Sequence, residues 1–295
     1  MALIAAPELL ALGTAATTAL SGMLVSEAFA SASVMTVTRW NVVVTFLLQA
    51  AIATAIGSWG SLDANSIRQL MLSGLFAIVI AAPVYYGSLA MLGPRAGVLV
   101  FSLNAPLTFL IGVPLLGEHP GPRALAGVAL VLAGLAVASW PRNDGLAVPA
   151  GHRWLGIGLG LIGALGQAGG TVAARPAMLA GADPFAAMAV RFGIAAAVLV
   201  ALQATPLARH FRASSASLRP LAVTFLGSLI GNGVGMTLMM VALAHAEAGV
   251  VATFAATSPI LILPMVWLRR GEAPAAAAWL GAAATFAGTA LVLLR

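Results

Sequence analysis

Residues 96–138 read AGVLVFSLNAPLTFLIGVPLLGEHPGPRALAGVALVLAGLAVA, and residues 249–292 read GVVATFAATSPILILPMVWLRRGEAPAAAAWLGAAATFAGTALV. The two segments are versions of one another. Matched features share an offset of 154 residues, and the matched prolines differ from it by one: Pro106 with Pro259, Gly117-Glu118 with Gly271-Glu272, Gly127 with Gly281, and Gly134 with Gly288. Such a series rarely recurs by chance. It indicates a tandem duplication and predicts a functional centre between the copies.

The composition indicates a membrane protein. The chain has 295 residues, of which 61% are hydrophobic and only 7% are charged, and its mean hydropathy is +1.04. So few charges cannot cover the surface of a soluble domain. With roughly 20 residues per crossing, the length suits about ten helices. A membrane barrel would instead show alternating strands of about ten residues, so we expect an all-α membrane protein.

Polar breaks between the apolar runs predict the helix positions and the division into repeats. We expect a first five-helix repeat over residues 1–140, a linker over 141–153 and a second five-helix repeat over 154–295. The expected helices are 8–28, 34–57, 69–92, 96–116, 123–140, 154–178, 184–203, 220–244, 248–268 and 275–294. Because five crossings are an odd number, the second repeat starts on the opposite side of the membrane. The repeats are therefore expected to be inverted, related by a pseudo-two-fold axis in the membrane plane.

Several functional classes are not expected. All 14 basic residues are Arg, and they stand singly or in pairs mostly at helix ends, which is typical of membrane spans rather than of a nucleic-acid surface. The chain has no Cys, which excludes thiol chemistry. Its four His residues lack metal-ligand spacing, and no nucleotide-binding motif is present. We therefore expect no cofactor and no metal.

Two shorter pairs fit the same duplication: Arg39-Trp40 with Arg191-Phe192, and Leu89-Ala90 with Leu243-Ala244. With these features, nearly the whole chain resembles the drug/metabolite transporter superfamily, specifically its ten-helix EamA-like group. The resemblance implies a secondary transporter of small polar metabolites, often amino acids. It also implies that helices one to four and six to nine surround a central cavity, with helices five and ten at the periphery. The Tyr-Tyr step on the third helix is similar to that of YddG-type exporters of aromatic amino acids.

Charged groups near the helix ends are candidates for a gate or for a structural role. An ionisable group inside a span is costly unless it is paired or hydrated. Arg39 and Arg191 lie a few residues inside their expected helices, where each could contact substrate, or else snorkel to a headgroup or cap carbonyls. Glu27 ends the first helix and could pair with Arg39.

Polar, aromatic and methionine side chains within the spans are the candidates for the cavity lining. Such residues also serve as ordinary interhelical hydrogen bonds or as packing. The candidates are Tyr85, Tyr86, Asn104, Gln167, Asn232, Met236, Met239 and Thr257.

Prolines and glycines mark candidate hinges. Pro106 and Pro259 each remove an intrahelical hydrogen bond, as Pro83 does in the third helix, and Gly233 lies among three alternating glycines in the eighth. We expect helices three, four, eight and nine to bend while helices five and ten stay comparatively fixed. The alternative is that these residues only permit close packing.

Together these features predict a secondary transporter in a bacterial inner (plasma) membrane, most simply an exporter of amino acids or related metabolites. We expect it to bind a small-molecule substrate and membrane lipid, not nucleic acid, and to function as a monomer. None of the eight acidic residues lies well inside an expected span, so uniport or exchange competes with proton antiport. An importer or exchanger of other small solutes is the alternative. A membrane-embedded lipid-modifying enzyme would need clustered Asp, His or Cys, so we do not expect an enzyme. The arginine distribution favours termini outside the cell, whereas the relatives suggest termini inside.

Overall fold

A computed structural model describes residues 7–28, 34–138, 150–203, 218–258, 260–261 and 276–293. The chain is all-helical, with ten helices and no strand in its described parts. Five of the described helices are long and apolar enough to cross a membrane, and shorter apolar helices accompany them. Large apolar side chains such as Leu110, Leu115 and Leu280 point outward, about 70% exposed. An apolar exterior of this kind suits lipid as the solvent.

The first repeat contains five helical segments. They are α1 (Pro7–Ala28), α2 (Val34–Ala55), the continuous run of α3 (Ala64–Gly74), η3 (Leu75–Ile80) and α4 (Ala81–Phe101), then α5 (Asn104–Leu116) and α6 (Pro122–Ala138). The short 3-10 turn η2 (Ser58–Ser61) joins α2 to α3. Asp63 begins α3 by accepting a hydrogen bond from the Ser66 backbone N–H at 2.7 Å. Hydrogen bonding by the Ser66 side chain, and then by its backbone, lowers the pKa of the Asp63 carboxyl.

The second repeat follows the same plan. Its elements are α7 (Ala150–Leu179), α8 (Pro184–Gln203), the continuous run of α9 (Leu218–Ser228), η5 (Leu229–Gly235) and α10 (Met236–Leu243), then α11 (Ala248–Ala255) and α13 (Ala276–Leu293). α11 is followed by a turn at Ala256 and Thr257, and the chain is helical again at Ser258.

The helical run of α4 continues through residues 93–95 to Phe101, but the chain reverses direction within it. The rings of Tyr85 and Phe101 have centroids 4.1 Å apart, and a Cβ added at Gly160 would lie within 3 Å of both Ser88 Oγ and Val100 Cγ1. A straight helix would separate residues 85 and 101 by about 24 Å, so the break expected at Gly93-Pro94-Arg95 is present as a reversal of the chain. The continuous helix expected over 248–268 is wrong: it is interrupted after Ala255, and residues 262–275 lie outside the described parts.

The contact between α6 and α13 shows how the repeats are related. A Cβ added at Gly134 would lie 2.5 Å from the Gly281 carbonyl oxygen, and one added at Gly288 would lie 2.6 Å from that of Gly127. Gly127 and Gly134 are the counterparts of Gly281 and Gly288, so the two contacts are reciprocal, as a two-fold axis requires. The helices are antiparallel, because partner numbers fall along α13 as they rise along α6.

The axis itself passes beside Val131 and Thr285. These residues are counterparts, separated by 154 positions, and the Thr285 hydroxyl donates to the Val131 carbonyl at 3.4 Å. A two-fold axis that relates antiparallel helices is perpendicular to them, so it lies in the membrane plane. The expectation of inverted repeats is confirmed.

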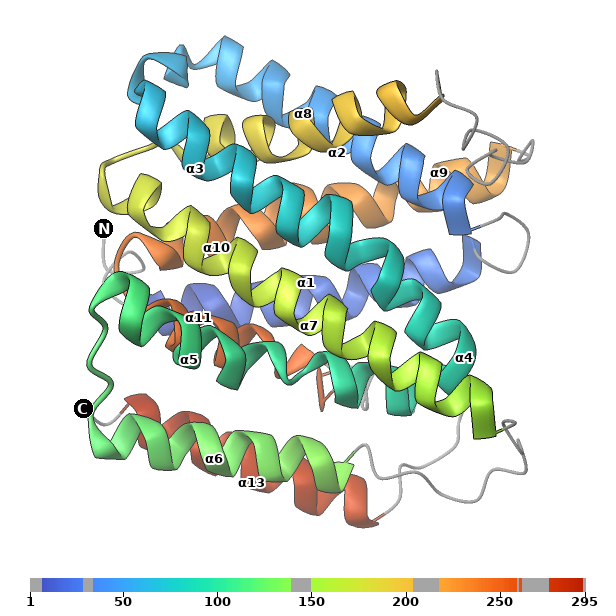
Figure 1. The fold of residues 1–295 in the computed structure, drawn as a ribbon, viewed down its shortest axis with the longest axis vertical. Coiled ribbons are helices and arrows are strands. Elements are labelled where there is room, and N and C mark those ends of the chain that lie inside the picture. The colour runs from blue at the N-terminus through green and yellow to red at the C-terminus, as the bar shows by residue number, and fades with distance from the viewer. Residues whose placement is uncertain are drawn as a thin grey trace.

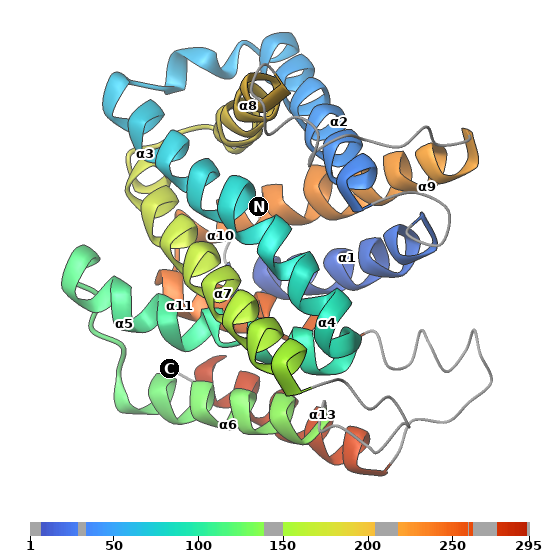
Figure 2. The ribbon, with the colours of Figure 1, turned by 45° about the vertical axis from the view of Figure 1, so that its right-hand side comes forward.

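The other helix contacts obey the same symmetry. α2 packs on α8 and α5 on α11, each a helix and its counterpart. The contact of α7 with α3, η3 and α4 is repeated as the contact of its counterpart α1 with α9, η5 and α10. Figures 1 and 2 show α6 and α13 side by side along one edge of the bundle, with the remaining helices grouped beyond them.

Candidate functional site

Arg191 is fully buried in the bundle. It lies seven residues into α8, about 10 Å along the helix axis. Its Nη1 lies 3.5 Å from the sulfur atoms of both Met188 and Met240, whereas its Nε and Nη2 have no hydrogen-bond partner among the described residues. Full burial does not allow the guanidinium to reach a lipid headgroup, and within the described chain no carbonyl caps it.

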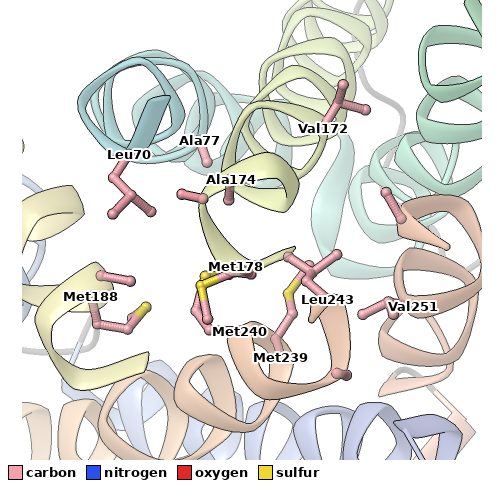
Figure 3. Packing of buried hydrophobic residues seen from close by; sticks show 14 of the residues in the cluster. Leu70, Ala77, Val172, Ala174, Met178, Met188, Met239, Met240, Leu243 and Val251 are labelled. Atoms are coloured by element: carbon pink, nitrogen blue, oxygen red, sulfur yellow. The ribbon is translucent and has the colours of Figure 1, made fainter. Parts of the chain in front are cut away.

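Methionines surround this arginine. Met178 of α7, Met188 of α8 and Met240 of α10 are all buried. Figure 3 shows the three side chains close together, with Leu70 on one side and Leu243 on the other. Thioether sulfurs are polarisable and only weak acceptors, so they hold a guanidinium loosely rather than neutralise it.

A pocket of about 680 Å³ opens at the end of the bundle next to the methionines. Gly57, Ser61 and His245 contribute to its wall, and Met178 lines it as well. Asp183, another wall residue, caps α8 by accepting hydrogen bonds from the backbone N–H groups of Phe185 and Ala186 at 2.9 and 3.1 Å. Met178 thus lines the pocket, whereas Arg191 does not.

A second polar group joins α2 to η5. Gln49 is fully buried, and its Nε2 donates to the Gly233 carbonyl at 3.1 Å and to the Thr237 hydroxyl at 3.0 Å. Nearby, Asn232 Nδ2 donates to Asn41 Oδ1 at 2.6 Å. A π-helix shifts the backbone hydrogen-bond ladder and leaves carbonyls to be satisfied from outside, and Gln49 does this here.

The two π-helices are counterparts. η3 begins at Leu75 and η5 at Leu229, which is the repeat offset again. Gly233 lies within η5, and Pro83 follows η3 after two residues. π-segments are frequent at functional sites and at kinks, so the duplicated pair fits the expected hinges, whose bending stays a prediction.

An aromatic pair lies where α4 meets α5. The rings of Tyr85 and Phe101 have centroids 4.1 Å apart. Asn104 Nδ2 donates to the Phe101 carbonyl at 2.8 Å, across the turn that begins α5. Tyr85 and Asn104, both expected in the cavity, therefore belong to one cluster.

The remaining candidates are dispersed. Gln167, Met236, Pro106 and Arg39 are half-buried, and Met239 is buried. The Thr257 hydroxyl donates to the Phe254 carbonyl at 2.7 Å, within the turn after α11. Pro259 and the side chains of Glu27 and Tyr86 lie outside the described residues. None of the residues expected to line the cavity lines the 680 Å³ pocket, so that role also stays a prediction.

An ion pair closes the pocket end of the bundle. Glu118, in the loop after α5, places Oε1 3.0 Å from Arg175 Nε of α7. The same oxygen accepts a hydrogen bond from the Ala248 backbone N–H at 2.7 Å, at the first residue of α11. One carboxylate therefore ties together three helices from both repeats. In the described parts of the chain, no three His, Cys, Asp or Glu side chains gather as a metal site would require.

Sequence reasoning identified Arg191, Asn232 and Gly233 but missed their partners. Met188 and Met240 gave no signal, because methionines in a span are most often packing. Gln49 did give a signal, as a lone amide in the apolar run of α2. Its partner is a π-helical carbonyl, which a residue pattern does not reveal.

Comparisons with known proteins fit this architecture. A solved structure described as "Crystal structure of protein" superposes with a TM-score of 0.76 at 19% identity, covering 100% of this chain and 97% of that one, which shows a shared fold. No curated protein matches the sequence. The profile of the EamA-like transporter family matches residues 6–140 and 154–294, one match for each repeat. On that match the chain belongs to the EamA-like transporter family.

Proposed function

We propose that this membrane transporter exports amino acids or related small metabolites by alternating access, as a monomer in a bacterial inner membrane. The observation that carries the proposal is the pair of inverted repeats with π-helices at equivalent positions. Inverted halves can exchange conformations and so open a central site to each side in turn. The π-helices η3 and η5 lie at equivalent positions, so each half can bend at the same place.

The interior suits a solute with an apolar part and a polar part. The Tyr85–Phe101 pair offers an aromatic surface, and Asn104 lies beside it. Gln49, Asn41 and Asn232 place amide groups between α2 and η5. Aromatic amino acids combine both characters, so they are the narrower substrate class that we propose.

The driving force in this proposal is a gradient of the solute itself or of an exchanged solute. The described acidic residues lie at helix ends or in loops, so they do not form a proton path through the bundle. Import or exchange of other small solutes is the alternative direction. The family consists of transporters rather than enzymes.

Counterflow in proteoliposomes tests the proposal. Vesicles preloaded with unlabelled phenylalanine should accumulate labelled phenylalanine from outside, whereas protein-free vesicles should not. Replacing Tyr85 and Tyr86 together by Ala should reduce the initial rate at least tenfold while leaving membrane insertion and the thermal midpoint close to wild type.

Two outcomes contradict the proposal. Absence of counterflow for all twenty amino acids removes the amino-acid assignment, and conversion of any labelled solute to a product would indicate an enzyme. In cells, deletion and overexpression should lower and raise tolerance to a high internal amino-acid load; the reverse pattern indicates import.

A further inference from the structure

Arg191 keeps two hydrogen-bond donors unpaired on one edge of its guanidinium. Nη1 is held between the sulfurs of Met188 and Met240. Nε and Nη2 are buried and have no hydrogen-bond partner in the described chain. In a guanidinium, the Nε–H bond and one N–H bond of Nη2 are parallel and match the two oxygens of a carboxylate. The protein thus anchors one corner of the group and leaves its carboxylate-binding edge unpaired.

The charge of Arg191 is also uncompensated. No carboxylate in the described parts of the chain lies within salt-bridge distance of it, and Glu118, the acid buried most deeply, is already paired with Arg175. A buried charge without a partner is costly in any protein, and more so inside a membrane span. If Arg191 had a permanent structural role, we would expect a carboxylate of the protein beside it, as Glu118 lies beside Arg175.

Methionines lie between Arg191 and the nearest pocket wall. Met178 lines the 680 Å³ pocket at the bundle end, and it belongs to the same buried cluster as Met240, whose sulfur contacts Nη1 of Arg191. Methionine side chains are unbranched and flexible, so they move aside at little cost and accept varied apolar shapes. The cluster therefore screens Arg191 from the pocket without a rigid barrier.

We propose that Arg191 binds the carboxylate of the transported solute through Nε and Nη2, while Met178, Met188 and Met240 contact its apolar part. The substrate class is then organic carboxylates, zwitterionic amino acids included, and solutes without a carboxylate are excluded. This inference rests on the proposed function as a transporter, but it does not require that the carboxylate be an amino acid.

The first experiment measures binding with the full chain in detergent. Each of the twenty amino acids, together with acetate, pyruvate and benzoate, is tested for its effect on the thermal midpoint, and each amino acid is paired with its amide. We expect at least one carboxylate to raise the midpoint and its amide to have no effect. Arg191→Lys, a point charge that cannot bind in a bidentate manner, should weaken binding at least tenfold. Binding of amides as strong as that of acids, or no stabilisation by any carboxylate, overturns the inference.

The second experiment needs no ligand. Arg191→Met removes the uncompensated charge and keeps the volume, so it should raise the thermal midpoint by about 3 °C. A fall of similar size would show that the arginine is structural and would overturn the inference. Arg68→Met is the matched control, because Arg68 is exposed and donates to the neighbouring Asn65 Oδ1 at 2.8 Å; its midpoint and its carboxylate binding should stay close to wild-type values.

The transport proposal and the carboxylate-site proposal are contradicted by different outcomes. If the wild type transports amino acids and Arg191→Met transports them with unchanged affinity, the transporter assignment holds and the carboxylate site is wrong. If carboxylates bind through Arg191 but none crosses a proteoliposome membrane, the carboxylate site holds and the transport proposal is wrong.

Discussion

Single polar residues in the interior fall into two kinds, those with partners and those without. Gln49 uses its amide N–H groups on acceptors of η5, whereas Arg191 keeps an edge of donors unpaired. A polar side chain with internal partners stabilises one arrangement of the helices. A side chain with unpaired donors instead favours the binding of a ligand that carries an acceptor. The position of Arg191 could be predicted from the matching Arg39. Its lack of a counterion could not, because that depends on where the acids of other helices end up in space.

At the residue scale, we predict that Gln49→Leu destabilises the protein. The substitution removes the donor to the Gly233 carbonyl and the Thr237 hydroxyl, while the bond from the Thr237 hydroxyl to that carbonyl at 2.6 Å remains, so the expected cost is about 1 kcal/mol for each hydrogen bond lost. The thermal midpoint in detergent measures the change. Gln69→Leu is the control: Gln69 is half-buried and makes no hydrogen bond with the described residues, so its midpoint should stay near wild type. Equal midpoints for both variants would contradict the role given to Gln49.

Two features of the helices matter most: the close contact between α6 and α13, and the two π-helical segments, in which the backbone hydrogen-bond pattern shifts. The α6–α13 contact is built on glycines that the sequence matched correctly, and ten helices in two repeats could be predicted from apolar runs alone. The π-helices could not, because a shifted ladder depends on backbone register and leaves no residue pattern. The reversal at Gly93-Pro94-Arg95 was predicted from its turn residues, and the closeness of the Tyr85 and Phe101 rings confirms it.

At the element scale, symmetry predicts equal effects for two distant substitutions. Gly134→Ala and Gly288→Ala should each push α6 and α13 apart, because either methyl group meets backbone of the partner helix. Each should cost about 1–3 kcal/mol. Gly158→Ala is the control, since nothing lies within 4 Å of its added Cβ, and it should gain up to about 1 kcal/mol from helix propensity. Thermal midpoints that differ clearly between the first two variants would mean that the contacts are not equivalent.

The ion pair at the bundle end gives a second prediction at this scale. Glu118→Gln keeps an acceptor for the Ala248 N–H but leaves Arg175 charged and largely buried, and should cost about 3 kcal/mol. In an Arg175→Met background the same substitution should cost much less. Measuring all four midpoints isolates the coupling between the two side chains; purely additive effects would show that the pair contributes nothing.

The proposed hinges can be tested by substitutions in the helices that carry them. Gly233→Ala and Pro106→Ala should slow transport more than they weaken substrate binding. The added methyl at Gly233 meets only the Leu48 side-chain tip, at 3.1 Å, so a gross clash is not the cause. Spin labels at the ends of helices three, four, eight and nine should change their separations when substrate is added. Fixed separations there, with movement of α6 or α13 instead, would exclude these hinges.

For the whole molecule, Arg39 and Arg191 mark a difference between the two halves. They are counterparts near opposite ends of the bundle, yet Arg191 is fully buried and Arg39 is half-buried. In the proposed alternating-access cycle, each half adopts in turn the conformation of the other. The cycle then predicts a second state in which Arg39 becomes buried and Arg191 becomes more exposed.

For the whole molecule, we predict which loops lie on the same side of the membrane. The loops around the pocket lie at the same end as the start of α1 and the end of α13 (Figure 1), and the start of α7 lies at the other end. Because the chain has no Cys, single substitutions report cleanly. Ser58→Cys and His119→Cys should react with a membrane-impermeant maleimide from one side, and Arg153→Cys from the other. Reaction of all three from one side would contradict the topology, and the side that reacts decides between the two orientations of the termini.

The reciprocal glycines of α6 and α13 also bear on how such a chain arose. A contact in which Gly134 meets Gly281 and Gly288 meets Gly127 is the contact that two identical five-helix chains would make in opposite orientations. An ancestral half-length protein that inserted into its membrane in both orientations would have dimerised through such a surface before the two halves were fused. Separately produced halves of this chain would then still carry the information needed to find each other.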